Sequence, residues 1–519
     1  MAQSRGKVYL IGAGPGNPGL LTVRGRELLG RADLVLYDYL VNPRILQYAR
    51  DGAQLECLGR HGHGRLVSQD EVHERMIEAA KRGLLVARLK GGDPAIFGRT
   101  TEELAALDEA NIPCEVVPGV TSAQAASSYT GIPLTHRDAA SCVAFVTGQQ
   151  ARDQDSPLDM AGLARFPGTL VFYMGVTTAP VWSAELIAHG KPGATPVAIV
   201  RRASWPQQET ILTTLGEMPN VLAPGKIRPP AIIIVGEAVA MRSARDWFAA
   251  RPLAGKTILV TRPIDQSESL VETLTELGAA VLVQPAIEIA PPRDWAAADD
   301  AIGQLATFDW LVFSSANGVR RFFERLLVHH QLDARALAGA KIAVIGPGTA
   351  EALAEYHLRT DLQPAEYRAE SLAEALSLDA KGKRFLLLRA SRGREVLSEM
   401  LTAAGGEVRQ AVVYESRDVT VPDPDIAEAV RAGRVDWVTV TSSAIARSLA
   451  AMFGPDLARA ELAAISPLTA GVLEEAGHAV AAVATAYTAA GIVDAILAHT
   501  GDGAQSNGGS KNGTRIHAD

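Results

Sequence analysis

The chain has 519 residues, of which 47% are hydrophobic and 21% charged, and its formal net charge is −8. A chain of this length is too long for one hydrophobic core, so we expect two or three globular domains. The acidic balance argues against nucleic acid as a partner, because nucleic-acid binding needs a basic face. It leaves a polyanionic small substrate open, since local arginine pockets work inside acidic proteins.

The cysteines and the N-terminal segment indicate a reducing compartment. The chain has three cysteines, and Cys57, Cys114 and Cys142 lie far apart without a C-x-x-C pair. This spacing favours free thiols and argues against a metal site. The first residues lack the apolar core of a signal peptide, and no apolar run reaches the ~20 residues of a membrane span. We therefore expect a cytoplasmic protein with no membrane partner.

A glycine-rich loop at 88–98 is the centre of the first half. The apolar run 84–89 predicts a buried strand, and the loop that follows contains Gly91, Gly92 and Asp93. Glycines let a ligand approach the backbone closely, and open α/β sheets bind ligands at the carboxyl ends of their strands. The pattern favours a small-molecule site, and the alternative is a tight turn with a structural aspartate.

Two threonines are spaced as helix starts after the loops of this half. Thr100 with Glu103, and Thr121 with Gln124, each have the spacing of a capping box. A helix N-terminus aimed into a cleft favours anionic groups. We therefore expect helices to begin at these two positions, the second at a P-G-V-T turn over 118–121.

The segment G-A-G-P-G at 12–16 resembles a dinucleotide-binding loop but departs from it. The fingerprint needs a glycine where Asn17 stands, and Pro15 lacks the N–H that would face a pyrophosphate. Nicotinamide binding remains a generic alternative. The next predicted strand, 32–37, ends in Asp38, which is either a helix cap or a catalytic base.

A second α/β lobe is predicted after a crossing segment at 131–137. Short apolar runs bounded by turn residues predict its strands. The predicted strands are 142–148, 169–173, 197–200, 210–215 in a hairpin, and 231–235. A closing helix and a linker are expected over 242–253.

Seven motifs occur in order across residues 6–248: GAGPGxPxLLT, YDxLV, RLKGGDPxIFGR, VPGVTSA, GIPLTHR, TLVFYMG and PAIIIVGEAV. Together they closely resemble uroporphyrinogen-III C-methyltransferase, of the tetrapyrrole methylase family. The resemblance implies a two-lobed α/β enzyme, usually a homodimer, with S-adenosylmethionine in the cleft between the lobes. It also implies two methylations of uroporphyrinogen III to precorrin-2, on the branch to sirohaem and cobalamin.

The resemblance assigns roles to individual residues of this sequence. The implied proton acceptor is Asp38. Arg60 stands where the family has a lysine, and arginine is a poor proton donor because it stays protonated. Asn17 replaces an acid of the family, so an acid role at that position is in doubt. The implied cofactor contacts are Pro15, Gly91, Gly92, Asp93, Ile96, Thr121, Ser122, Met174 and Ala203.

The chemistry of such a methylation suits these residue types. The pyrrole carbon attacks the methyl group, so the chain mainly aligns the reactants, which is worth ~7–11 kcal/mol. Proton loss afterwards suits a carboxylate base. Basic side chains would pair with the substrate carboxylates at ~1.5–3 kcal/mol each. The candidates are Arg24, Arg60, Lys90 and Arg137, and the alternative for each is a solvated surface charge.

The second half contains an internal repeat. The segment at 255–263 has a counterpart at 382–390, the one at 308–317 at 435–444, and the one at 343–353 at 463–473. Repeated strand and helix patterns of this kind indicate two similar α/β lobes. Two β-rich connectors, 284–292 and 411–419, predict a two-stranded hinge. One lobe would then be discontinuous, about 255–290 with 416–498, and the other would be 291–415.

This half, about 255–498, resembles uroporphyrinogen-III synthase through T-R-P, S-S-A-N-G-V, a G-x-x-T-A turn, V-V-Y-E-S and S-S-A. The resemblance implies cyclisation of hydroxymethylbilane with inversion of the last ring and loss of water, without a cofactor. Tyr414 falls where the family places a tyrosine near the leaving hydroxyl. The implied cleft positions are Ser315, Asn317, Thr349, Ser442 and Thr469. Plain helix capping is the alternative for these hydroxyls.

We therefore expect a methyltransferase domain at 1–250, with lobes about 6–135 and 136–248, and a synthase domain at 251–499. The Gly/Asn/Ser-rich tail 500–519 should be disordered. The synthase product is the methyltransferase substrate, so the fusion joins consecutive steps. Two alternatives stay open: a methylase of a later corrin intermediate, and a second half that binds a ligand without synthase activity.

Overall fold

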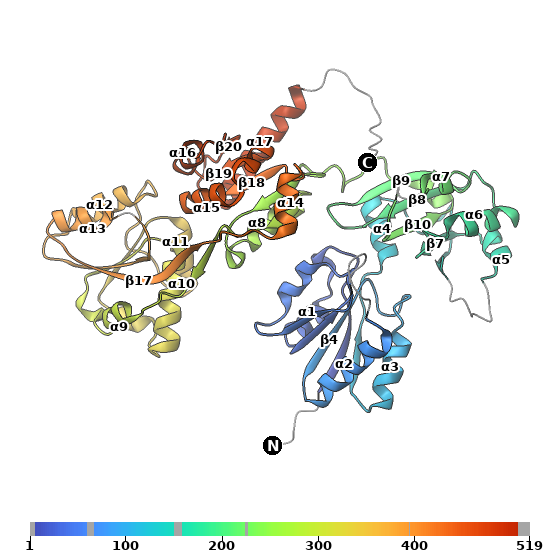
Figure 1. Cartoon of the computed structure of the whole chain (residues 1–519), viewed down its shortest axis with the longest axis horizontal. Coiled ribbons are helices and arrows are strands. Elements are labelled where there is room, and N and C mark those ends of the chain that lie inside the picture. Colours follow the sequence, from blue (N-terminus) through green and yellow to red (C-terminus); the bar gives the residue numbers. More distant parts are fainter. Residues whose placement is uncertain (1–5, 60–66, 150–157, 224–226, 394, 507–519) are drawn as a thin grey trace. The chain divides into compact units, whose positions relative to one another are not determined.

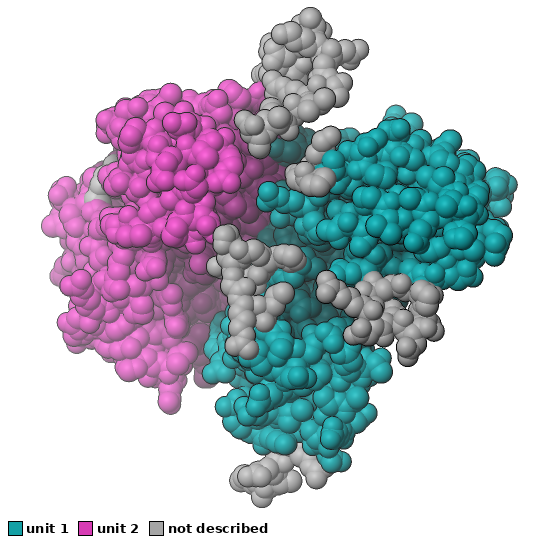
Figure 2. Space-filling view, turned by 45° about the vertical axis from the view of Figure 1, so that its right-hand side comes forward, with its two compact units in different colours: residues 1–255 teal, residues 256–519 magenta. Residues whose placement is uncertain are grey.

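The computed structural model of the chain describes residues 6–59, 67–149, 158–223, 227–393 and 395–506. The chain divides into two compact units, Met1–Gly255 and Lys256–Asp519, coloured separately in Figure 2. Each unit contains two five-stranded sheets flanked by helices (Figure 1). The α/β class expected from the sequence is confirmed. Over the described ranges, no helix has both the length and the apolarity to cross a membrane.

The first sheet of unit 1 is parallel, with strand order β3-β2-β4-β1-β5. Strand β3 was not foreseen, because its side chains are largely exposed and form no apolar run. The strands are β1 Lys7–Gly12, β2 Leu34–Tyr37, β3 Gln54–Cys57, β4 Leu85–Lys90 and β5 Cys114–Val117; the helices are α1 Val23–Leu29, α2 Gln69–Lys81 and α3 Thr100–Glu109.

Alternation along β1 shows why this sheet is covered on both faces. Tyr9 and Ile11 pack in the cluster that contains α1, whereas Val8 and Leu10 pack with α2 and α3. Successive side chains of a strand point to opposite faces. A strand buried on both sides therefore reads as a continuous apolar run, as this one does.

The second sheet of unit 1 is mixed, with order β6-β7-β10-β8-β9, and only β6 and β7 are parallel. Helix α4 follows β5 of the first sheet, yet its alanines and Tyr129 pack on β7, β8 and β10. This helix thereby joins the two lobes. The elements are α4 Ser122–Thr130, β6 Val143–Thr147, α5 Met160–Arg165, β7 Thr169–Tyr173, α6 Ala179–Ala188, β8 Pro196–Arg201, β9 Glu209–Thr214, α7 Met218–Val221 and β10 Ala231–Val235.

The closing helix predicted over 242–253 is wrong. A short 3-10 helix, Glu237–Met241, is followed by turns. The carboxylate of Asp246 accepts hydrogen bonds from the backbone N–H groups of Phe248 and Ala249. A side chain that bonds nearby backbone N–H groups in this way offers the chain an alternative to a helix.

Unit 2 is built from two similar sheets. The first, β12-β11-β18-β19-β20, is parallel; the second, β13-β17-β16-β14-β15, is parallel except for β13. The strands are β11 Thr257–Val260, β12 Ala280–Val283, β13 Ile287–Ala290, β14 Trp310–Phe313, β15 Lys341–Val344, β16 Arg384–Ala390, β17 Glu407–Asp418, β18 Trp437–Val440, β19 Glu461–Ala464 and β20 Ala482–Val483. The helices are α8 Glu268–Glu276, α9 Ala296–Ile302, α10 Ala316–Glu324, α11 Pro347–Ala354, α12 Ala369–Ser377, α13 Val396–Ala403, α14 Pro424–Arg431, α15 Ser443–Phe453, α16 Pro467–Glu475 and α17 Ala489–Ser506.

A pair of antiparallel strands connects the two sheets of unit 2. Strand β13 pairs with the end of the twelve-residue β17, from Ile287 opposite Asp418 to Ala290 opposite Glu415. Figure 1 shows β17 running from its own sheet toward the other one. The sequence placed a two-stranded hinge here. The structure adds that β13 belongs to the sheet of β14–β17, although its residues precede that lobe in the chain.

Helix α17 continues to Ser506, and disorder over the tail 500–519 stays a prediction. The hydroxyl of Thr500 donates to the carbonyl of Ile496 within this helix. Residues 507–519 lie outside the described part of the chain.

Three glycines bring the carboxyl ends of β1, β4 and β5 together. A Cβ on Gly12 would lie 2.6 Å from the Cα of Gly119, and one on Gly119 would lie 2.3 Å from the carbonyl oxygen of Gly92. Backbone atoms are the obstacle at both positions, so no side-chain movement relieves the clash. Gly14 and Gly92 then exchange backbone hydrogen bonds of 3.1 and 2.8 Å. This contact fixes the position of the loop after β1 relative to the loop after β4.

We expect Gly119→Ala to destabilise unit 1 by ~1–3 kcal/mol, because overpacking forces backbone shifts. Chemical denaturation of the full chain measures the change. The matched control is Gly30→Ala, since its Cβ would have no neighbour closer than 3.5 Å. Equal stability of the two variants would contradict the close approach of the three strand ends.

Candidate functional sites

The loop after β4 has an open and a closed part. Gly91 is exposed, whereas Gly92 is buried at φ +70° and bonded to Gly14. The carboxylate of Asp93 accepts from the backbone N–H of Ala95 at 2.8 Å and of Gly119 at 2.9 Å. Both of its oxygens therefore hold the loop in shape, which leaves the backbone around Gly91 accessible to a ligand.

The capping box predicted at Thr100 is wrong. Helix α3 is capped by Arg99 at φ +55°, and the Thr100 hydroxyl donates to the carbonyl of Pro94. Glu103 does not reach back to the helix start. It is fully buried and pairs with two cations of β4.

Thr121 caps α4 by position, but its side chain makes no cap hydrogen bond. Its hydroxyl lies 2.6 Å from the phenol oxygen of Tyr173, which also accepts from the N–H of Ala123 at 3.2 Å. Burial raises the pKa of Tyr173. The box expected with Gln124 is therefore replaced by a bond between the lobes, and Ser122 lies next to Gly92.

Unusual backbone angles gather around several of the predicted cofactor residues. Met174 has φ +53°, and Ala203 lies between Arg202 at +48° and Ser204 at +69°. Phe97, which follows Ile96, has φ +54°. Such conformations cost ~1–3 kcal/mol each and cluster at functional sites. Ala203 is buried, whereas Met174 is 49% exposed.

Large apolar side chains are exposed beside the glycine loop. Leu40 is 40% exposed, and its Cβ lies 3.5 Å from a Cβ built on Gly91. Phe97 is 41% exposed and its ring centroid lies 5.0 Å from that of Tyr173. Met174, the residue after Tyr173, is exposed as well. Exposed apolar patches mark binding sites.

The loop of Pro15 to Asn17 is held against the second lobe. The indole N–H of Trp205 donates to the carbonyl of Pro15 at 3.1 Å, and the Asn17 N–H donates to the Ser204 hydroxyl at 3.0 Å. The Asn17 side chain donates to Tyr129 at 3.1 Å. A Cβ on Gly16 would lie 2.0 Å from the Trp205 ring. The uncharged amide of Asn17 therefore has a structural role, which is to hold this loop against the second lobe.

Asp38 lies at the end of β2 with a partner that the sequence did not suggest. One of its oxygens, Oδ1, is 2.7 Å from the guanidinium of Arg88, while its side chain remains 34% exposed. Arg88 in turn pairs with Glu103, which also binds Lys90 at 2.5 Å.

Lys90, a predicted substrate ligand, is buried within its lobe. Its side chain is 3% exposed and already paired, and burial lowers the pKa of its ammonium against the opposing effect of Glu103. The sequence feature that could have predicted this burial is in β4, where Arg88 and Lys90 put two cations on one face of an otherwise apolar strand.

The other predicted basic ligands lie in different settings. Arg24 is half exposed and pairs with Glu115 at 2.8 Å, which raises its pKa. Arg137 is exposed in the segment between the lobes. Arg60 lies outside the described residues.

In unit 2 the structure brings Tyr414 and Ser315 together. The phenol oxygen of Tyr414 lies 3.0 Å from the Ser315 hydroxyl, which also caps α10 by accepting from the Gly318 N–H. Burial raises the pKa of Tyr414, while hydrogen bonds from Ser315 and Asn317 oppose that rise. The raised pKa keeps the phenol of Tyr414, which lies within β17, in its neutral form.

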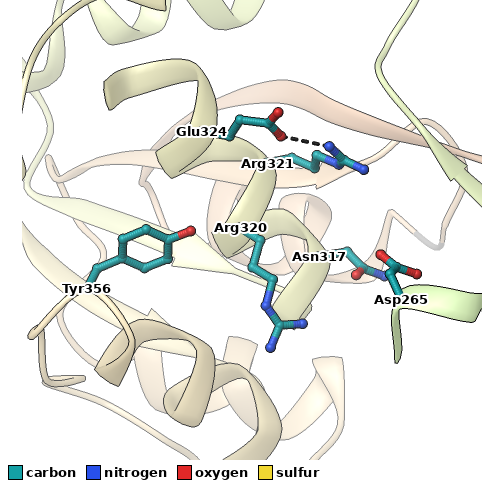
Figure 3. Close-up of a pocket in the computed structure, with 6 residues that line it drawn as sticks. All are labelled: Asp265, Asn317, Arg320, Arg321, Glu324 and Tyr356. Atoms are coloured by element: carbon teal, nitrogen blue, oxygen red, sulfur yellow. Dashed lines mark hydrogen bonds and ion pairs between the residues drawn. The ribbon is translucent and has the colours of Figure 1, made fainter. Parts of the chain in front are cut away.

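Asn317 links the two lobes of unit 2. Its side-chain oxygen accepts from the amide of Gln266 at 2.7 Å. Asn317 also lines a cavity of about 350 Å³, with the side chains drawn in Figure 3. The cavity is lined by Asp265, Asn317, Arg320, Arg321, Glu324 and Tyr356. Arg320 and Arg321 are paired with Glu355 and Glu324 at 2.6 and 2.7 Å.

Arg262 was missed as a site residue, although its T-R-P motif was noticed. It is partly buried just after β11 and has no hydrogen-bond or ion-pair partner among the described residues. Burial and the charge of Arg320 lower its pKa, against the attraction of Asp265. A partly buried cation without a paired anion is free to bind an anionic group of a ligand.

The remaining hydroxyls mainly serve their own helices. Ser442 caps α15, and Ser466 caps α16 while bonding to the hydroxyl of Thr469 at 3.2 Å. Thr349 is buried in the first turn of α11. Among residues with described placement, no group of His, Cys, Asp and Glu is arranged to hold a metal ion.

Comparison with protein families assigns both halves. Residues 7–219 match the model of the tetrapyrrole (corrin/porphyrin) methylases, and residues 268–494 match that of uroporphyrinogen-III synthase HemD. A porphyrin biosynthesis protein HemD of Ruminiclostridium josui is 35% identical over 84% of this chain and 87% of its own length. The chain belongs to this family, which joins a tetrapyrrole methylase to a uroporphyrinogen-III synthase.

Other relatives match smaller shares of the chain. A uroporphyrinogen-III C-methyltransferase of Bacillus subtilis is 36% identical over 70% of this chain and 74% of its own length. A sirohaem synthase of Zymomonas mobilis is 46% identical over 48% of this chain and 52% of its own length. A Thermus thermophilus uroporphyrin-III C-methyltransferase, crystallised with S-adenosylhomocysteine, is 39% identical over 45% of this chain and 99% of its own, with a TM-score of 0.40.

Proposed function

We propose that the chain cyclises hydroxymethylbilane to uroporphyrinogen III and methylates that product twice with S-adenosylmethionine to give precorrin-2. The observation that supports this most is the pairing of the two families in one chain, because the product of one reaction is the substrate of the other. The methylase half is bounded at about 1–250 and the synthase half at about 251–499. We also propose a cytoplasmic homodimer formed through the methylase half.

The residues of unit 1 fit S-adenosylmethionine. The accessible backbone at Gly91 has no side chain to obstruct a nucleoside, and Leu40, Phe97 and Met174 offer apolar contact. The full proposed contact set is Pro15, Gly91, Gly92, Asp93, Ile96, Thr121, Ser122, Met174 and Ala203. When bound, this cofactor supplies a methyl group on a sulfonium. The chain aligns the reacting carbon with it and holds Asp38 ready to accept a proton.

The hydrogen bond from the Trp205 indole to the Pro15 carbonyl, here called the clasp, should position the loop of Pro15 to Asn17 for the cofactor. We expect Trp205→Phe to weaken binding of S-adenosylhomocysteine by about 2- to 10-fold, as loss of one hydrogen bond of ~0.5–1.5 kcal/mol predicts. Isothermal titration measures this. The control is Trp247→Phe, since Trp247 also donates its indole N–H to a carbonyl, that of Ser128 at 2.9 Å. A loss of affinity shared by both variants would contradict the role of the clasp.

In unit 2, Tyr414 is the proposed proton donor to the leaving hydroxyl. Ser315 is a proposed cleft position, and the 3.0 Å between its hydroxyl and the phenol oxygen of Tyr414 supports both roles. Asn317, Thr349, Ser442 and Thr469 remain proposed cleft positions, and catalysis rests largely on holding the flexible chain in a closing shape. Arg262 supplies an unpaired cation, and hydroxymethylbilane supplies carboxylates. Arg24, Arg60 and Arg137 are the proposed carboxylate ligands of unit 1.

Arg262→Gln should raise KM for hydroxymethylbilane by about 10- to 100-fold, because a charge-assisted bond contributes ~1.5–3 kcal/mol. The control is Arg335→Gln, an exposed arginine of the same unit that pairs with Asp333. Steady-state cyclisation rates give both constants. An unchanged KM for the Arg262 variant would remove it from the substrate site.

The function is tested by supplying hydroxymethylbilane and S-adenosylmethionine to the full chain and identifying the product by mass. A dimethylated uroporphyrinogen is expected. Uroporphyrinogen III without methylation would refute the methylase assignment. Spontaneous uroporphyrinogen I, with methylation only when isomer III is supplied, would show that the second half binds without catalysing.

A further inference from the structure

Four charged side chains, from Lys90 to Asp38, form a continuous chain of ion pairs. The Lys90 ammonium lies 2.5 Å from one oxygen of Glu103, and the other oxygen of Glu103 lies 3.2 Å from Nε of Arg88. A terminal nitrogen of Arg88 then lies 2.7 Å from Oδ1 of Asp38. Positive and negative groups alternate along the chain, so each ion is flanked only by opposite charges.

Three of the four side chains are buried. The Asp38 side chain is 34% exposed, whereas the side chains of Arg88, Lys90 and Glu103 are 4%, 3% and 0% exposed. A buried ion that loses its partner costs ~3–5 kcal/mol. The three inner residues therefore keep one arrangement, and only the outermost group of the chain meets solvent.

Arg88 is fixed on three sides. Besides Asp38 and Glu103, its third nitrogen donates to the carbonyl of Leu89 at 2.9 Å. Arg88 has several rotatable bonds, and Glu103 holds the Nε end so that the other end points at Asp38. The backbone of Asp38 is also held, since its N–H donates to Leu89 at 3.2 Å. Oδ1 is therefore restrained, and Oδ2 has no partner among the described residues.

We propose that Glu103, itself held by Lys90, is a positioning residue for methylation. It orients Arg88, and Arg88 holds Asp38 with one oxygen bound and the other presented to the macrocycle. Asp38 takes a proton from the methylated ring, and the electron pair of the broken C–H bond returns to the ring. This inference rests on the proposed function of unit 1, because it needs Asp38 to act as the base.

The test compares two neighbouring glutamates of α3 in the full chain. Glu103→Gln should lower kcat for methylation by about 10- to 100-fold, the effect expected from misplacing a catalytic group, and leave KM for S-adenosylmethionine unchanged. Glu102→Gln is the matched control, because Glu102 is 48% exposed and pairs only with Arg99 in the same turn. Equal kcat for the two variants would overturn the proposal.

A double-mutant cycle separates positioning from general damage. Asp38→Asn alone should slow methylation by about 10²- to 10⁴-fold, as loss of a general base predicts, with S-adenosylhomocysteine binding retained. In that background Glu103→Gln should cause no further loss, since its effect passes through Asp38. Losses that multiply would show a merely structural role and overturn the proposal.

Folding is controlled by a second variant. If Glu103→Gln does not fold, Lys90→Gln replaces it in the same cycle, because it weakens the hold on Glu103 from the far side. The wild-type chain distinguishes the two levels of failure. Wild type that makes no dimethylated product refutes the proposed function, whereas active wild type with multiplicative losses refutes only the role of Glu103.

Discussion

The close approach of three backbone segments is the constraint on which unit 1 depends. Gly12 and Gly119 leave no room for a Cβ, because Gly12, Gly119 and the carbonyl of Gly92 touch where β1, β5 and the loop after β4 meet. Because these segments touch directly, the carboxylate of Asp93 reaches the N–H of Gly119 and closes the loop. The rest of the proposed cofactor surface is placed by that closure, including the accessible backbone at Gly91.

The two lobes are connected differently in the two units. In unit 1, helix α4 leaves one sheet and packs on the other, and Trp205 of the second lobe binds the Pro15 loop of the first. The lobes there share a core and several hydrogen bonds. In unit 2, strands β13 and β17 carry the chain between sheets that each have their own core. The lobes around the proposed cofactor site of unit 1 are thus closely joined, whereas those around the proposed cyclisation site of unit 2 are joined mainly by two strands.

Much of the fold could be predicted because apolar runs and turn residues coincide. The run before Gly12 became β1, and the connectors at 284–292 and 411–419 became the paired β13 and β17. Failures occurred where polar side chains had tertiary partners. Glu103 has the spacing of a capping residue but lies among buried charges, and Asp246 bonds its own backbone where a helix was expected. Local spacing carries no information on which distant group a side chain will meet. Arg262 was overlooked for the same reason, since a sequence motif does not predict whether a buried side chain will have an ion-pair partner.

The amide pair of Gln266 and Asn317 has a consequence for substrate entry in unit 2. This 2.7 Å bond joins the two lobes of unit 2 and contains no charge. Breaking such a neutral bond in water costs ~0.5–1.5 kcal/mol, which thermal motion supplies readily, at most about a tenfold bias toward the latched form. Its strength should also be nearly independent of ionic strength, since screening acts on charges. A long, highly charged linear molecule could then be admitted without its own counter-ions altering the latch.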